Sequence, residues 1–146
     1  MKPLLSYLIF ITLAVTSQIV FANQSTDPQR VVVSGGSITE VIYALDEQQR
    51  IIGVDSTSVF PTQAKEKPQI GYVRRISAEG ILSLNPDLVI GEADTGPKKV
   101  VEQLKQTGIN LVILDENDNL GGIENKIKKI ASLLNVAHKG DVLAQS

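Results

Sequence analysis

The sequence contains no cysteine and only one histidine, His138. The absence of cysteine excludes disulfides, thiolate zinc sites and cysteine nucleophiles. It also removes the residue to which a bacterial lipoprotein attaches its lipid, so an exported form is expected to be free of a lipid anchor. One remote histidine leaves few building blocks for a hydrolytic triad or a zinc site. This inventory predicts a protein that is not an enzyme.

Acidic side chains are present but gather in one polar stretch, which contains Asp115, Glu116 and Asp118. A solvated turn explains this cluster better than general acid–base catalysis does. The formal net charge is only -2, which argues against a nucleic-acid binder, because such proteins usually carry a basic stripe. Short basic runs are interpreted as solvated surface, and they comprise Lys65, Lys67, Lys126, Lys128 and Lys129.

Residues 1–22 are interpreted as a signal peptide. Lys2 gives a minimal positive region, Leu4 to Val20 carries no charge, and Val20-Phe21-Ala22 predicts cleavage after Ala22. The alternative is a membrane anchor, since the run approaches the ~20 residues needed to cross a bilayer. Polar residues dilute the run, which favours cleavage and no stable membrane anchor afterwards. Residues 23–29 are expected to form a polar tether.

The remaining chain alternates short apolar runs with helical patterns, which is typical of βαβ units and a parallel sheet. We expect strands over 30–33, 50–55, 87–90 and 110–114. Helices are expected over 38–45, from Pro97 to Gly108 and after residue 122. A further helix is expected after Ser77, with Ser77 as its cap and Leu82 facing inward. Ser37 is a predicted N-cap with Glu40 three residues later, as in a capping box. The pattern predicts an α/β fold, a doubly wound, mostly parallel sheet flanked by helices.

The stretch from Ile70 to Ile81, IGYVRRISAEGI, is the most informative. Tyr72 follows a glycine in a short extended piece, and Arg74 and Arg75 follow it within three residues. Tyrosine is a known axial ligand of haem iron. Arginine holds carboxylates in two-pronged hydrogen bonds. Tyr43 differs, because it lies in a predicted helix and is expected to pack in the core.

The segments VVVSGGSITEVIYAL, IIGVD, IGYVRRISAEGILSLNPDLVI and VVEQLKQTGINLVIL resemble, in order and spacing, the periplasmic haem-binding proteins of bacterial haem ABC importers. Those proteins have two lobes joined by one long helix, and the resemblance runs from about Arg30 to the end. It implies a periplasmic protein that carries haem (hemin) as its transported ligand to an ABC importer permease and catalyses no reaction. It also implies one Rossmann-like amino-terminal lobe over 30–137, with the inter-lobe helix beginning at 138–146 and the second lobe absent.

The resemblance also implies roles for individual residues. Tyr72 would bind the haem iron, and Arg74 or Arg75 would hold a propionate, with Arg74 favoured because it lies two residues after the tyrosine. Glu79, near the start of a helix, would dock on the permease, although the helix dipole alone also favours a carboxylate there. The remaining implied contacts line the cleft rim, namely Gly35, Gly36, Val59, Phe60 and Val73.

Two alternatives stay open at this point. The same fold could bind a ferric siderophore or a corrinoid instead of haem. The chain could also be a truncated lobe that does not transport and acts as an interaction module. The sequence alone does not decide whether it is a fragment or a truncated gene product.

Overall fold

The computed structural model describes residues 27–115 and 120–146. The predicted signal peptide, most of the tether, Glu116 and Asp118 therefore lie outside the described residues. No helix in the described ranges combines the length and apolar character that crossing a bilayer requires.

A four-stranded parallel sheet forms the centre of the fold, as predicted. Its strands are β1 (Val31–Ser34), β2 (Ile51–Val54), β5 (Leu88–Gly91) and β6 (Leu111–Ile113), in the order β2-β1-β5-β6. The three valines of β1 have no exposed surface, because helices cover both faces of a parallel sheet. The chain places β2 on one side of β1 and then crosses to place β5 and β6 on the other side, so the connections leave β1 and β5 in opposite directions. Such a switch point places ligand sites at the carboxyl ends of the strands.

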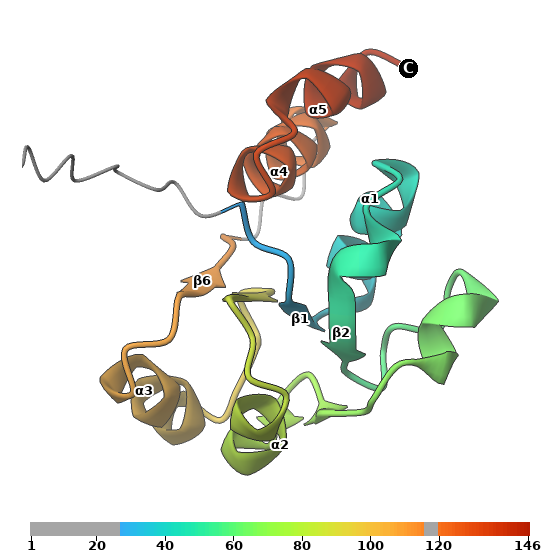
Figure 1. Cartoon of the computed structure of the whole chain (residues 1–146). Coiled ribbons are helices and arrows are strands. Elements are labelled where there is room, and N and C mark those ends of the chain that lie inside the picture. The colour runs from blue at the N-terminus through green and yellow to red at the C-terminus, as the bar shows by residue number, and fades with distance from the viewer. Residues whose placement is uncertain (1–26, 116–119) are drawn as a thin grey trace, which may run out of the picture.

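Helices cover the two faces of this sheet in two groups (Figure 1). On one face, α1 (Gly36–Ala44) and α4 (Leu120–Leu133) pack against Val31 and Val33, with α5 (Ala137–Ala144) beside α4. On the other face, α2 (Ala78–Ser83) and α3 (Lys98–Gln106) pack against Val32 and Val89. The alternation arises because successive side chains of a strand point to opposite faces. The predicted α/β fold is confirmed.

The smaller elements complete the chain between these layers. A two-stranded antiparallel hairpin is formed by β3 (Gly71–Tyr72) and β4 (Arg75–Ile76), and short 3-10 helices are η1 (Gln48–Arg50) and η2 (Thr62–Glu66). The sequence indicated only an extended piece where the hairpin lies. Gly140 of α5 is buried against α4, and a Cβ there would lie 2.4 Å from the Cβ of Ala131. This glycine therefore permits the close packing of α5 on α4.

Local sequence signals were right at one helix start and wrong at another. The Ser77 side chain accepts a hydrogen bond from the Gly80 N–H at 2.9 Å, which confirms the predicted cap of α2. Ser37 is not an N-cap, because α1 begins at Gly36 and its cap position is Gly35. The Ser37 hydroxyl instead donates to Glu92 Oε1 at 2.5 Å. Leu82, expected to face inward, is 37% exposed.

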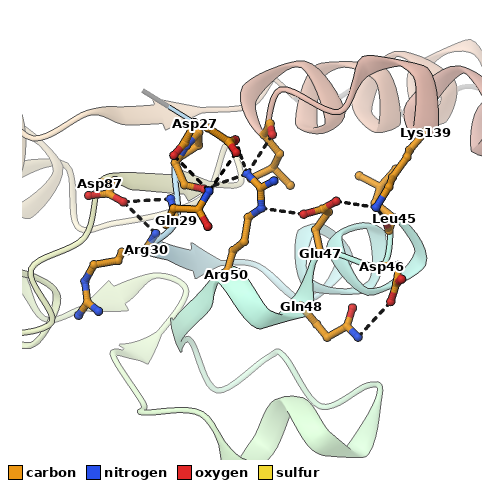
Figure 2. Close-up of polar contacts among 12 residues, drawn as sticks. Asp27, Gln29, Arg30, Leu45, Asp46, Glu47, Gln48, Arg50, Asp87 and Lys139 are labelled. Atoms are coloured by element: carbon orange, nitrogen blue, oxygen red, sulfur yellow. Dashed lines mark hydrogen bonds and ion pairs between the residues drawn. The ribbon is translucent and has the colours of Figure 1, made fainter. Parts of the chain in front are cut away.

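A buried carboxylate fastens α5 to the amino-terminal edge of the sheet. The Glu47 side chain is only 5% exposed and pairs with Arg50 Nε and with Lys139 Nζ, each at 2.6 Å. We call Glu47, Arg50, Lys139 and Asp27 the Glu47 clasp (Figure 2). Arg50 Nη1 also donates to the Leu134 carbonyl at 3.0 Å. The clasp thus joins the first described residues, the end of α1, the end of α4 and α5.

We predict that Glu47→Gln lowers the free energy of unfolding by about 3 kcal/mol, since breaking a buried ion pair leaves uncompensated charge. Urea unfolding followed by circular dichroism measures this as a lower midpoint with an unchanged slope. Glu102→Gln, at an exposed position of α3, is the matched control and should shift stability by less than about 0.5 kcal/mol. Equal midpoints for both variants would show that the clasp is not a main support.

Candidate functional site

The carboxyl ends of the four parallel strands bring distant loops to one edge of the sheet. These are the turn at Gly35 after β1, the loop 55–60 after β2, the loop 92–97 after β5 and residues 114–115 after β6. We call this side the carboxyl edge. The predicted ligand residues Gly35, Gly36, Val59 and Phe60 all lie in its loops or helix starts.

One buried carboxylate organises two of these loops. Asp55 has no exposed surface and follows β2 directly. Its Oδ1 accepts from the Gly35 N–H at 2.8 Å and from the Ser58 hydroxyl at 3.2 Å. Its Oδ2 accepts from the N–H and the hydroxyl of Thr57, at 3.0 and 2.7 Å. Asp55 therefore holds the start of α1 and the loop that carries Val59 and Phe60 in one arrangement.

The β3–β4 hairpin presents the predicted iron ligand beside this loop. The Gly71 carbonyl accepts from the Ser56 N–H at 2.8 Å, and the Val73 carbonyl accepts from the Gly96 N–H at 2.9 Å. The hairpin is thus tied to the loops that follow β2 and β5. Gly71 has φ 110°, and a Cβ there would lie 2.5 Å from the Arg75 carbonyl oxygen. Only glycine fits this tight crossing without strain.

The hairpin changes which arginine accompanies Tyr72. Tyr72 is 48% exposed, and its register partner across the hairpin is Arg75. Opposed residues of an antiparallel pair place their side chains on the same face. The expected extended chain, which put Arg74 on the side of Tyr72, is wrong because residues 73 and 74 form the turn. Arg74 instead pairs through Nε with Asp94 Oδ2 at 2.9 Å.

The apolar residues predicted for the cleft rim divide into two kinds. Val59 is 54% exposed and Phe60 is 62% exposed, so both offer apolar surface at the carboxyl edge. Val73 is only 5% exposed. Its side chain packs inside the lobe, and the expectation that it covers a ligand face is therefore wrong for this lobe as folded.

The two glycines of the rim serve contacts within the protein. A Cβ on Gly35 would lie 2.5 Å from the Glu92 side chain, and one on Gly36 would lie 2.7 Å from the Thr57 carbonyl oxygen. The Gly36 N–H also donates to the Thr57 hydroxyl at 3.0 Å. The space beside these two glycines is thus occupied by Glu92 and Thr57.

Other residues singled out in the sequence lie away from the hairpin. Tyr43 is half-buried on α1 and packs against the core, as predicted. Burial and the nearby carboxylate of Glu66 raise the pKa of the Tyr43 phenol, which disfavours its phenolate. His138 is exposed on α5 and Glu79 is exposed in the first turn of α2.

Sequence reasoning missed a polar cluster at the opposite side of the carboxyl edge. Lys126 of α4, expected to be solvated, is 28% exposed and pairs with Glu92 Oε1 at 3.2 Å. Its ammonium group also contacts the Ser37 hydroxyl. No local signal could have found this cluster, since Ser37 and Lys126 are 89 residues apart.

The cluster forms one wall of a hollow of about 790 Å³ between α1 and α4. We call it the edge hollow. Its lining includes both charged and apolar side chains, among them Glu40, Val41, Glu92, Ile113, Asp115, Ile123, Lys126 and Lys129.

We predict that Asp55→Ala lowers the free energy of unfolding by about 3 kcal/mol, because the buried N–H of Gly35 and the part-buried N–H of Thr57 lose their acceptor. Asp55→Asn keeps one acceptor oxygen and should cost less. Asp141→Ala, at an exposed position of α5, serves as the control in the same thermal and urea unfolding measurements. A loss no larger than that of the control would remove Asp55 as the organiser of this edge.

Comparison with known proteins agrees with this architecture. A family model described as periplasmic binding protein matches residues 31–146. The vitamin B12-binding protein of Pectobacterium carotovorum subsp. carotovorum (strain PC1) is 32% identical over 105 residues, which cover 72% of this chain and 38% of that protein.

Two solved structures are similar as well. A periplasmic haem-binding protein from Pseudomonas aeruginosa superposes with a TM-score of 0.78 at 36% identity, covering 81% of this chain and 42% of that one. The apo periplasmic haem-binding protein of Roseiflexus sp. RS-1 gives 0.77 at 42% identity, covering 80% and 45%. The chain thus spans about two fifths of the length of these relatives. With a parallel sheet, helix-covered faces and a family match across all its strands, the chain belongs to the periplasmic binding protein family.

Proposed function

We propose that this chain is the amino-terminal lobe of the periplasmic substrate-binding component of an ABC importer, and that its substrate is haem. The observation that carries the proposal is the half-exposed Tyr72, which the hairpin presents at the carboxyl edge with Arg75 opposite. A phenolate oxygen is a hard, anionic ligand, so it would favour ferric over ferrous iron. Binding and release, with no bond made or broken in the substrate, would be the whole activity.

The side chains around Tyr72 suit an iron porphyrin. Val59 and Phe60 offer exposed apolar surface for the flat macrocycle. Arg75 has no ion pair within the described residues, and its guanidinium has the fork geometry that matches a propionate. Arg74, which already pairs with Asp94, would be a second propionate contact. Tyr43 is a poorer ligand because its phenol resists ionisation.

Similarity to the two haem-binding structures, at 36% and 42% identity, supports haem as the substrate. A corrinoid is the second candidate, and it is supported by the 32% identity to a vitamin B12-binding protein. Chemistry separates the two, because a corrinoid already carries its cobalt in a ring with mainly amide side chains. Such a ligand would make little use of an anionic tyrosine or a guanidinium fork.

In this proposed function, each part of the chain has its own role. Residues 1–22 would direct export to the periplasm and be removed after Ala22, and 30–137 would form the substrate-binding lobe. We assign α5, which begins at Ala137, as the start of the inter-lobe helix. The matched region covers only 38% and 42% of two longer relatives, whose remaining length would hold a second lobe after it.

Glu79 is the proposed contact with the permease. It is exposed in the first turn of α2, beside the half-exposed Leu82. An exposed carboxylate at a protein surface gives specificity and faster association with a basic partner surface. This role would be separate from ligand binding, because Glu79 makes no ion pair with any residue described at the carboxyl edge.

We predict that Tyr72→Phe weakens ferric hemin binding at least about 10-fold, since loss of a supporting contact to a metal ligand alone costs that much. An ultraviolet–visible titration measures the affinity and the change in the porphyrin absorption band. Tyr43→Phe is the matched control and should bind like the parent protein.

Parallel titrations with cyanocobalamin decide between the two substrates. Tight cyanocobalamin binding by the parent protein, together with hemin spectra that Tyr72→Phe leaves unchanged, would replace haem with a corrinoid.

For Glu79 we predict unchanged hemin affinity in Glu79→Gln but slower hemin-dependent growth of an iron-starved strain that carries the cognate permease. The reason is that the lost carboxylate contacts the permease and not the ligand. Glu102→Gln is the control for charge and expression. Growth equal to that of the parent would remove the docking role.

A further inference from the structure

Two cations at the carboxyl edge are held by carboxylates of a single loop. In the loop after β5, Asp94 pairs with Arg74 of the hairpin at 2.9 Å, and Glu92 pairs with Lys126 of α4 at 3.2 Å. Two residues of one chain that lie two positions apart have Cα atoms within ~7 Å. The loop therefore contacts a cation from the Tyr72 side and a cation from the α4 side through two carboxylates that lie two residues apart.

Neither ion pair is deeply buried. The side chains of Arg74 and Asp94 are 68% and 30% exposed, and exposed pairs contribute only about 0–1 kcal/mol. The side chains of Lys126 and Glu92 are 28% and 24% exposed. Glu92 also accepts the Ser37 hydroxyl at 2.5 Å, so it keeps a hydrogen bond when the ammonium group leaves. Both pairs can therefore exchange their carboxylate for that of a ligand at low cost.

We propose that Lys126 is a specificity-determining residue that recognises a carboxylate of the bound macrocycle, and that Glu92 occupies the ammonium group until that carboxylate replaces it. The inference rests on the proposed haem function and extends it to a residue on the far side of the site. Asp94 would have the same relation to Arg74. The loop after β5 would thus keep both cations placed while the ligand is absent.

The edge hollow offers room for a ligand beside Lys126. Its volume is about 790 Å³, and Val41, Ile113 and Ile123 give it an apolar lining beside Lys126. Ile123 is 56% exposed, so it can contact an entering ring. Glu40 and Asp115 also line the hollow and would repel an acid elsewhere in it. A ligand carboxylate is therefore accepted at the lysine ammonium group and disfavoured beside those acids.

This arrangement selects for macrocycles with acidic arms. A haem bears two propionates, whereas its dimethyl ester has the same ring and iron with no charge on the arms. The parent protein should prefer hemin to the iron(III) protoporphyrin dimethyl ester. The preference should depend on Lys126, while the iron bond to Tyr72 should contribute to both ligands alike.

The test is a set of absorption titrations with ferric hemin and with the dimethyl ester in the parent protein, Lys126→Gln, Lys126→Arg and Glu92→Gln. We expect Lys126→Gln to weaken hemin about 10-fold, which corresponds to about 1.4 kcal/mol, and to leave the ester unchanged. Lys126→Arg should retain the preference for hemin. Glu92→Gln should strengthen hemin binding, because the competing carboxylate is lost. Lys128→Gln, at an exposed position of the same helix, is the control.

The outcomes distinguish failure of the Lys126 role from failure of the proposed haem function. If Lys126→Gln weakens the binding of hemin and of the ester equally, or weakens neither, the role of Lys126 is overturned. Haem then remains the proposed substrate. If Tyr72→Phe weakens the binding of both ligands, and only Lys126→Gln changes the ratio of hemin affinity to ester affinity, the haem function and the role of Lys126 are both supported. Failure of the parent protein to bind either ligand overturns both.

Discussion

The carboxyl edge depends on the buried Asp55 carboxylate. It has no ion-pair partner among the described residues, and its charge is balanced by N–H and O–H donors of Gly35, Thr57 and Ser58. Those donors lie at the start of α1 and in the loop after β2. Hydrogen bonds to a charged acceptor are stronger than neutral ones, so this one group fixes two loops relative to each other. The hairpin with Tyr72 is then bonded to that fixed loop through Ser56.

The layers of the fold could be predicted because their signals are local. Runs such as Val31-Val32-Val33 and Leu88-Val89-Ile90 are β-branched or apolar throughout, which is typical of strands buried on both faces. Ser77 caps α2 with a partner three residues away. Ser37 offers the same local pattern, yet Glu92, 55 residues later, binds its hydroxyl instead. Local propensity decides where no distant partner competes, and it fails where one does.

The sequence predicted which residues would form the candidate site, but it did not predict the geometry that the structure gives them. Tyr72, Val59 and Phe60 are exposed where the resemblance needed surface. The hairpin turn at Val73 and Arg74 contains no glycine, proline or asparagine, so turn chemistry gave no signal for it. Bonds from Ser56 and Gly96 hold the hairpin in place, and they come from loops that only the folded sheet brings together. Burial of Val73 and the pairing of Tyr72 with Arg75 follow from that hairpin.

The terminal helices are fastened at both edges of the sheet, with unequal strength. At the amino-terminal edge, Lys139 of α5 pairs with Glu47, whose side chain is 5% exposed. At the carboxyl edge, Lys126 of α4 pairs with the more exposed Glu92. Removing one partner of a deeply buried acid costs about 3–5 kcal/mol, and the cost is smaller where water reaches the remaining carboxylate, as at Glu92, whose side chain is 24% exposed. The proposed exchange of partners at the carboxyl edge would therefore leave the clasp intact. Under the proposed exchange, the weaker pair would respond to a ligand while the stronger one keeps α4 and α5 on the lobe.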